Sequence, residues 1–538
     1  MKKNVLALSI AAMIGGLGFA GAASAVVITG TGPFDGTTKM TKTGATALAV
    51  DAGGSGHALV VPYYNAQNGN MTVLHVVNTD TSRGKAVKVR FRGAANSDDV
   101  LDFQVFMSPG DVWTAAVTAG ADGVAQLVTA DNTCTLPKLT SGVAQSFITG
   151  RLNPKLDAAA KANQTREGYV EIFNMADIPA SASVDPKNLY KAIKHVNGVA
   201  PCTATALDAT LVDYASEAAA TAAGFDTPSG GLMGDWYIMN VAQTTTFSGS
   251  ATAINATGTA DATTGRVHGN FIHFPQLDAA VGGLGVGAYT ADPLFRADSK
   301  DAVGAAAASL IAAGSYDLPD LSTPIFGTAD APGVAAKTQA AVLTNALAVK
   351  AVTNQYANDA SISAKTDWVF SMPTRRYSVA ANYAATSSAL PAYRVFTDLT
   401  VATSPAAPAT KTWFTAANTT VSGDLICVKA DGQSFWDREE NSKTSGAVFS
   451  PGTVAVTTFC GEASVLSFAD TGNSVLAASV ARQNVTGAYV NGWSNVSVAN
   501  GTNGLPILGS SFIKLTNPSA SAGMSGTYGI TWPHRFTK

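Results

Sequence analysis

Charged residues are scarce in this chain. Only 13% of its 538 residues are Asp, Glu, Lys or Arg, about half the share typical of soluble proteins. The net charge of −3, without a basic patch interleaved with aromatic residues, argues against nucleic acid as a partner. A surface covered by small neutral polar groups repels its neighbours weakly and suits side-by-side packing, although the same composition is also a general habit of exported proteins.

Long apolar runs are lacking beyond the N-terminus. No later segment approaches 18 uninterrupted apolar residues, so we expect no transmembrane helix in the mature chain. Met1–Ala25, by contrast, has the features of a secretory signal peptide: Lys2 and Lys3, the apolar segment Val5–Ala20, and the small-x-small site Ala23-Ser24-Ala25. We therefore predict export to the cell surface or medium, with the periplasm as the alternative location. The alternative for this segment is an uncleaved membrane anchor.

Cysteine is equally rare, with four residues in the chain: Cys134, Cys202, Cys427 and Cys460. An even number of cysteines in an exported protein favours disulfide bonds. Three pairings can be drawn. We prefer Cys134–Cys202 with Cys427–Cys460, because each bond then joins the nearest cysteines within one half of the chain. The spacing is not C-x-x-C, so neither a redox motif nor a zinc knuckle is expected.

Motifs of known catalytic sites are lacking as well. The six histidines form no H-E-x-x-H, and there is neither a G-x-S-x-G elbow nor a Walker loop. His268 and His273 are five residues apart and would point to opposite faces of a strand, so a shared metal is not expected. Gly283–Gly287 superficially resembles a dinucleotide loop but lacks its spacing. We therefore predict no catalytic, metal-binding or cofactor-binding residues.

Two acidic segments are candidate exceptions. Asp437-Arg438-Glu439-Glu440 follows Phe435-Trp436, which would suit a carbohydrate-facing aromatic residue beside glycosidase-type acids. A solvated loop with local Arg–carboxylate pairs is the favoured interpretation. Asp98-Asp99, with Asn96 and Ser97, offers oxygen atoms to calcium but lacks the spacing of a complete calcium loop. Calcium is thus a candidate cofactor rather than a predicted one.

The pattern that the chain does carry is that of β-strands, most clearly over Gly56–Val117. Met71–Asn78 is apolar on both faces and is predicted to be a central strand. Ala86–Arg92 alternates apolar with cationic residues, namely Val87, Val89 and Phe91 with Lys88, Arg90 and Arg92. This period of two predicts a strand with one face on the core and its cationic face in water.

Further strands follow at short intervals. Val100–Met107 and Val112–Val117 are joined by the turn residues Ser108–Asp111, and Tyr169–Met175 and Gly234–Ala242 have the same character. Strands spaced by roughly 10 residues with local turns predict a mainly β fold of antiparallel, immunoglobulin-like β-sandwiches.

The segment 279–360 differs, because strand alternation stops and alanine becomes frequent. Ala302–Ala313 and Ala335–Val352 are predicted to be helices with apolar residues at helix-compatible spacings. We interpret the segment as a partly helical insertion between two β regions; the alternative is a partly ordered loop. The predicted organisation is a signal peptide over 1–25, an N-terminal β-rich domain over 26–278, the insertion, and a C-terminal β-rich region over 361–538.

Several short segments resemble an uncharacterised group of exported Gram-negative proteins, loosely described as cell-surface or S-layer-like. The segments that carry the resemblance are Val61–Tyr64, Val77–Asp80, Val87–Phe91, Leu101–Phe103, Ser108–Trp113, Asp131–Thr135, Arg166–Tyr169, Thr366–Val369, Pro373–Arg376 and Pro533–Arg535. The resemblance implies a location and a β-rich fold, and it brings no catalytic residues.

These observations together predict a non-enzymatic, exported cell-surface protein that is structural or adhesion-like, such as a self-assembling surface-layer subunit. Its expected partners are further copies of itself or other surface components. One alternative is a secreted hydrolase of polysaccharides that uses Asp437, Glu439 or Glu440. Another is an outer-membrane β-barrel, although the chain ends without a terminal aromatic residue and its alanine-rich middle fits a barrel poorly.

Overall fold

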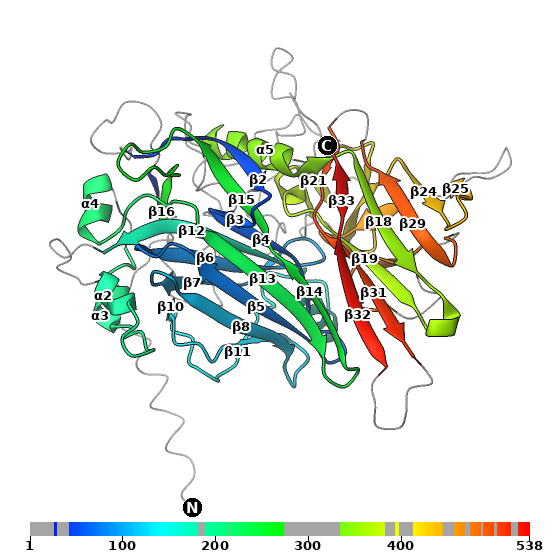
Figure 1. The fold of residues 1–538 in the computed structure, drawn as a ribbon, viewed down its shortest axis with the longest axis horizontal. Helices are drawn as coiled ribbons and strands as arrows, with labels where there is room; N and C mark the ends of the chain where they lie inside the picture. Colours follow the sequence, from blue (N-terminus) through cyan, green and yellow to red (C-terminus); the bar gives the residue numbers. More distant parts are fainter. Residues whose placement is uncertain are drawn as a thin grey trace, which may run out of the picture.

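The computed structural model describes residues 26–28, 42–180, 189–273 except 213 and 215, 334–383 except 382, 393–396, 413–444, 457–468, 474–485, 488–499, 503–517 and 526–538. Strands account for 50% of the structure and helices for 10%, which confirms the predicted mainly β class. Figure 1 shows the strands of the N-terminal half on one side of the molecule and those of the C-terminal half on the other.

The N-terminal half contains two large sheets. The first has the strand order β10 (Cys134–Leu136), β7 (Asp99–Met107), β6 (Arg83–Gly93), β12 (Glu167–Pro179), β4 (Ala58–Asn65), β15 (Thr252–Gly258) and β2 (Ala45–Asp51). The second has the order β11 (Gln145–Ser146), β9 (Ala125–Val128), β8 (Val112–Ala119), β5 (Asn70–Asn78), β13 (Leu232–Asn240) and β14 (Thr245–Ser250), with β3 (Ser55–Gly56) also paired to β13. All of these strand pairs are antiparallel.

A tight turn carries the chain from the first sheet to the second. Asn68 and Gly69 both have positive φ angles, 49° and 79°, and the Asn70 N–H donates to the Gln67 carbonyl at 2.9 Å. Two consecutive residues with positive φ define a type I′ turn, which asparagine and glycine adopt at little cost. The predicted central strand over 71–78 becomes β5, an inner strand of the second sheet.

The two sheets pack face to face across an apolar core. Phe91 of β6, Phe103 of β7 and Trp113 of β8 belong to one buried cluster, and the ring centroids of Phe103 and Trp113 are 5.6 Å apart. The apolar residues predicted to face the core of the sandwich therefore do so.

A second layer covers the opposite face of the first sheet. It includes α2 (Leu189–Ile193), α3 (Ala204–Asp208), α4 (Glu217–Ala222) and part of α5 (Val334–Leu347). The disulfide between Cys134 and Cys202 ties β10 to this layer. The first sheet is consequently buried on both faces, and β4, β7 and most of β6 and β12 are inaccessible to water.

The prediction that the cationic face of β6 lies in water is wrong. Lys88, Arg90 and Arg92 are all 0% exposed. Arg90 lies directly opposite Asp102 of β7 on one side and Glu171 of β12 on the other. The alternation of residue types was informative about the strand, but the counter-charges lie on neighbouring strands that the local pattern does not reveal.

The C-terminal half contributes two further sheets. The third has the order β25 (Ser442–Thr444), β24 (Gly432–Trp436), β29 (Asn491–Ser497), β18 (Ala351–Ala357) and β33 (Arg535–Thr537). The fourth has the order β28 (Arg482–Asn484), β27 (Ala463–Ser467), β19 (Lys365–Ser371), β31 (Ser510–Thr516) and β32 (Thr527–Pro533), with β27 and β28 parallel. Tyr356, Trp368 and Phe435 are among the residues of the core between these sheets.

Smaller elements complete the structure. The short sheets pair β1 (Val26–Ile28) with β16 (Phe271–His273), β17 (Ala348–Val349) with β30 (Leu505–Pro506), and β20 (Val379–Ala381) with β21 (Arg394–Phe396), and they join β22 (Thr419–Ser422), β23 (Leu425–Lys429) and β26 (Thr458–Cys460). Two 3₁₀ turns, η1 (Ala360–Ile362) and η2 (Arg375–Tyr377), and α1 (Ala158–Thr165) complete the set. The second disulfide joins Cys427 of β23 to Cys460 of β26, so the preferred cysteine pairing is confirmed at both bonds.

The alanine-rich segment is only partly as predicted. α5 ends at Leu347 rather than at 352, because Ala348 and Val349 pair with β30 and residue 351 begins β18. β18 thus lies within the segment 279–360 but belongs to the third sheet. The helix predicted over 302–313 lies outside the described residues. In the part of the chain that is described, no helix is both long and apolar enough to cross a membrane.

Candidate functional site

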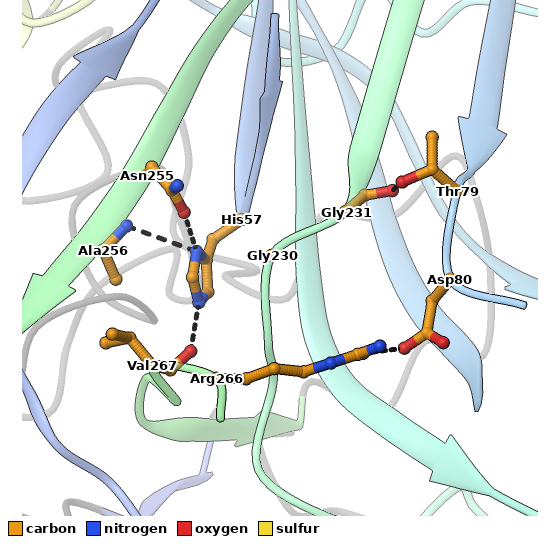
Figure 2. Close-up of a pocket in the computed structure, with 9 residues that line it drawn as sticks. All are labelled: His57, Thr79, Asp80, Gly230, Gly231, Asn255, Ala256, Arg266 and Val267. Carbon is orange, nitrogen blue, oxygen red and sulfur yellow. Dashed lines mark hydrogen bonds and ion pairs between the residues drawn. The ribbon is translucent and has the colours of Figure 1, made fainter. Parts of the chain in front are cut away.

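A polar pocket of about 320 Å³ opens where the two N-terminal sheets meet (Figure 2). Its walls come from the start of β4, the loop after β5, the entry to β13, and β15 with the loop that follows it. The lining residues are His57, Thr79, Asp80, Gly230, Gly231, Asn255, Ala256, Arg266 and Val267.

His57 is held by hydrogen bonds at both ring nitrogens. Nδ1 lies 2.7 Å from Asn255 Oδ1 and 3.2 Å from the Ala256 amide nitrogen, and Nε2 lies 3.1 Å from the Val267 carbonyl oxygen. Burial lowers the pKa of His57 to about 4, and the hydrogen bond to Asn255 opposes this shift only in part. The ring is therefore neutral at pH 7 and joins β4 to β15, and its nitrogen atoms are not free to accept a substrate proton.

Asp80 and Arg266 form an ion pair on the opposite wall. Burial disfavours the charged form of Asp80, but hydrogen bonds from Arg266 and Ser82 outweigh burial and hold the pKa of this carboxyl well below its usual range. The Thr79 hydroxyl donates to the Gly231 carbonyl at 2.9 Å. Each of these polar side chains already has a hydrogen-bond or ion-pair partner within the protein. The pocket therefore resembles a structural hydrogen-bond network rather than a catalytic site.

A buried ion pair lies beneath the pocket. Lys85 Nζ is 2.9 Å from Asp177 Oδ1, and the Ser229 hydroxyl donates to Asp177 Oδ2 at 2.5 Å. Burial opposes ionisation of Asp177, yet the charge of Lys85 and the hydrogen bonds of Ser229 and Asn174 lower its pKa overall. This group fixes the end of β12 to the chain entering β13.

A larger group of buried charges joins the two halves of the chain. We call it the junction cluster; its members are Arg92, Glu171, Arg375, Arg376 and Glu462. Glu171 accepts from Arg92 Nε at 3.1 Å and from Arg376 Nη2 at 3.2 Å. Glu462 pairs with Arg375 and accepts from the Arg376 amide at 3.3 Å. One carboxylate of the first sheet is therefore shared by cations from both halves.

The neighbouring calcium candidate is occupied by protein partners. Asp98 Oδ2 accepts from the Tyr383 hydroxyl at 2.7 Å, Asp99 pairs with Arg90 at 3.2 Å, and Ser97 Oγ lies 2.8 Å from Tyr169 Oη. The Asn96 amide donates to the Asp424 carbonyl at 2.9 Å. Over the described residues, no group of three or more His, Cys, Asp or Glu side chains is arranged to hold a metal ion.

The burial of Asp98 leads to a pH-dependence that a single substitution tests. Burial raises the pKa of Asp98 to about 7, with the Tyr383 hydrogen bond opposing the shift. The folded chain then keeps a proton that the unfolded chain loses near pH 4, so Asp98 weakens the fold as pH rises from 5 to 7. Between pH 5 and pH 7, we expect the free energy of unfolding to fall by about 2 kcal/mol more in the native chain than in Asp98→Asn. Urea unfolding at pH 5, 6 and 7 checks this, and parallel pH profiles for the two proteins would contradict it.

The acidic segment after Trp436 forms an exposed hairpin between β24 and β25. A hydrogen bond from the Asn441 side chain to Asp437 Oδ2 at 2.9 Å lowers the pKa of Asp437, and backbone hydrogen bonds add to this shift. Asp437 Oδ1 accepts from the amides of Glu439 and Asn441, both at 2.9 Å. Glu439 and Glu440 project from the turn and are exposed. Asp437 thus shapes the turn, and the segment 438–440 is exposed to solvent.

The aromatic residue of this segment has a partner that the sequence did not indicate. Trp436 stacks on Trp493, with ring centroids 3.9 Å apart and ring planes 5° apart. The two residues are direct cross-strand neighbours in β24 and β29, and Trp493 is 38% exposed. Because they are 57 positions apart in sequence, only the strand pairing brings them together.

The remaining histidines serve the fold in the described part of the chain. His268 is buried between Thr227 and Thr264, and His75 lies beside Thr114 on the outer face of β5. His195 Nδ1 is 3.6 Å from Asp111. The side chain of His273 and the residues 283–287 lie outside the described residues. Both ring nitrogens of His268 lie within hydrogen-bonding distance of hydroxyl or carbonyl oxygens.

Comparisons with known proteins add no relative to this description. No protein-family model, curated protein or solved structure matches the chain.

Proposed function

We propose that this chain is a non-enzymatic, exported protein of the cell surface with a structural or adhesion-like role. The observation that carries the proposal is the inward placement of its few charges. The buried ionisable residues include Asp80, Lys85, Lys88, Arg90, Arg92, Asp98, Asp99, Asp102, Glu167, Glu171, Asp177, Asp367, Arg375, Arg376, Arg394 and Glu462. The surface is thus poorer in charge than the composition alone suggests, which favours close packing of copies or of other surface components.

Covalent and buried polar links between distant parts of the chain also support this role. Two disulfides, which are compatible with an oxidising compartment, hold separate parts of the chain. Glu167 of β12 accepts from the amides of Ser479 and Val480 at 2.7 and 3.2 Å, and from Tyr63 at 2.8 Å. With the junction cluster, these bonds fix the two halves against each other, as a load-carrying or packed subunit requires.

Cell fractionation tests the proposal. We expect the chain in the outer-surface or medium fraction, with its cysteines resistant to alkylation until a reductant is added. Deletion of the gene is expected to remove ordered surface material. An unchanged surface together with soluble protein in the periplasm, or reduced cysteines in the cytoplasm, would refute the proposal. Repeating the fractionation with a chelator reveals whether surface retention depends on calcium.

A further inference from the structure

The outer face of the third sheet combines exposed aromatic rings with neutral hydrogen-bonding groups. Strand register and burial assign the outward side chains of β24, β29 and β18: the inward positions are buried and pack in the core, whereas the outward ones reach solvent. Around the tryptophan pair, the outward residues are Ser434, Trp436, Trp493, Asn495, Thr353 and Gln355. Figure 1 shows β24, β25 and β29 at the edge of the molecule, away from the first two sheets.

The tryptophan pair forms a ridge on this face. The two rings arise from neighbouring strands and stack in parallel with their centroids 3.9 Å apart. Trp436 covers one face of Trp493, so the other face of Trp493 is directed toward β18. There its cross-strand neighbour is Gln355, which is exposed. The free face of the Trp493 ring and the polar side chains of β18 beside it therefore border one shallow site.

The charges on and around the face select the occupant. None of the outward side chains of the three described strands β24, β29 and β18 is ionisable. On the edge strand β33 the exposed cation Arg535 lies opposite Thr353, on the side of the face away from β24. The strip between β24 and β18 therefore offers no counter-charge of its own to an ionic ligand. Beside the ridge, the hairpin carries Asp437, Glu439 and Glu440 with Arg438, and Asp359 lies near Asn491. The acidic excess at that end disfavours polyanions.

We propose that this face binds an uncharged polysaccharide of β-linked glucopyranose units. Such a ring has equatorial hydroxyls at its edge and C–H groups on its faces. The electron-rich face of Trp493 attracts those C–H groups. A sugar ring stacked there directs its edge hydroxyls toward the polar side chains of β18. Gln355 and Thr353 supply amide and hydroxyl groups that donate to and accept from them, and Thr353 is held in place by Asn495 at 2.7 Å.

The inference deepens the proposed adhesion-like role by naming a ligand class, and its test does not depend on location. Purified mature chain is titrated with cellohexaose while tryptophan fluorescence and heat are recorded. We expect binding with a Kd on the order of 1 mM or below. Trp493→Ala should weaken it about tenfold or more, Trp493→Tyr less, and Gln355→Ala by about threefold.

The matched control is Trp532→Ala on β32, because Trp532 is 44% exposed but lies on the fourth sheet. Its affinity is expected to equal that of the native chain, and hexagalacturonate is expected not to bind. Lack of cellohexaose binding, equal affinity in Trp493→Ala, or equal weakening by both tryptophan substitutions would overturn the inference. So would sedimentation showing that Trp493 instead joins two copies of the chain. None of these results bears on the fractionation, so this inference and the proposed function fail separately.

Discussion

Replacement of Glu171 by alanine is expected to lower the free energy of unfolding by about 3–5 kcal/mol. Glu171 is 0% exposed and accepts from Arg92 of the first sheet and from Arg376 of the C-terminal half. Its removal leaves two buried guanidinium groups without this shared carboxylate, and desolvated charges are costly when a partner is lost. Urea unfolding followed by tryptophan fluorescence measures the effect.

The position of Glu171 also predicts how unfolding changes. Glu171 joins cations from both halves. In Glu171→Ala we therefore expect the C-terminal half and the N-terminal sandwich to unfold in separate transitions. Glu171→Gln keeps an acceptor oxygen without the charge and should have a smaller effect. Glu439→Ala, on the exposed hairpin, should change stability by about 0.5 kcal/mol or less. A Glu171→Ala protein that unfolds like Glu439→Ala would show that the junction cluster contributes little.

Acidification from pH 7 to 4.5 is expected to cost about 5 kcal/mol through two buried histidines together. Burial lowers the pKa of His534 to about 3 and that of His57 to about 4. His534 Nε2 lies 2.9 Å from the Val369 carbonyl oxygen, and its Nδ1 lies 2.9 Å from the Asn354 amide. The ring also stacks on Phe370 with centroids 4.9 Å apart, so an added proton would charge a group enclosed by aromatic rings.

The sign follows from the two states. Unfolded histidine takes up a proton near pH 6.5, whereas these folded histidines resist protonation until lower pH. Their contribution is therefore complete above pH 6.5 and is lost as pH falls toward 4 and 3. Each histidine should account for about 2.5 kcal/mol between pH 7 and 4.5. Asp98 changes the free energy of unfolding in the opposite direction over this pH range. The histidine contributions are therefore measured by comparing histidine variants with the native chain at each pH.

His534→Gln and His57→Gln isolate these contributions. Each variant should be less stable than the native chain at pH 7, and the difference should shrink by about 2.5 kcal/mol at pH 4.5. His75→Gln, at a half-buried position on the outer face of β5, provides the matched histidine substitution outside the core. A difference between His534→Gln and the native chain that is the same at both pH values would contradict the neutral, buried state of His534.

The sequence was most informative where the signal was local. The alternating segment 86–92 and the apolar segment 71–78 both form strands, as predicted. Cysteine spacing was sufficient for the pairing, because the nearest cysteines fell in separate halves. Helix ends were less predictable: α5 stops at Leu347 because residues far along the chain compete for the backbone at 348 and beyond.

The candidate sites were largely hidden from sequence reasoning. The acidic hairpin was found with Trp436, but Trp493 is not adjacent to it in sequence, and no motif marks the pocket around His57. Asp98 and Asp99 were interpretable only as oxygen donors until Tyr383 and Arg90 were placed beside them. Strand pairing brings Trp493 to Trp436, whereas Tyr383 reaches Asp98 from a segment 285 residues away and Arg90 lies on the strand next to Asp99.

What the amino-acid sequence determined alone is the mainly β character, the turns and the cysteine framework, since these follow from backbone preferences and side-chain periodicity within a few residues. Tertiary structure decided which polar faces are buried. Lys88, Arg90 and Arg92 look solvent-facing in isolation, and they are enclosed because carboxylates from β7 and β12 and a covering layer meet them in space. A buried charge is tolerated only when counter-charges or hydrogen bonds compensate its desolvation, and these partners come together only in the tertiary structure.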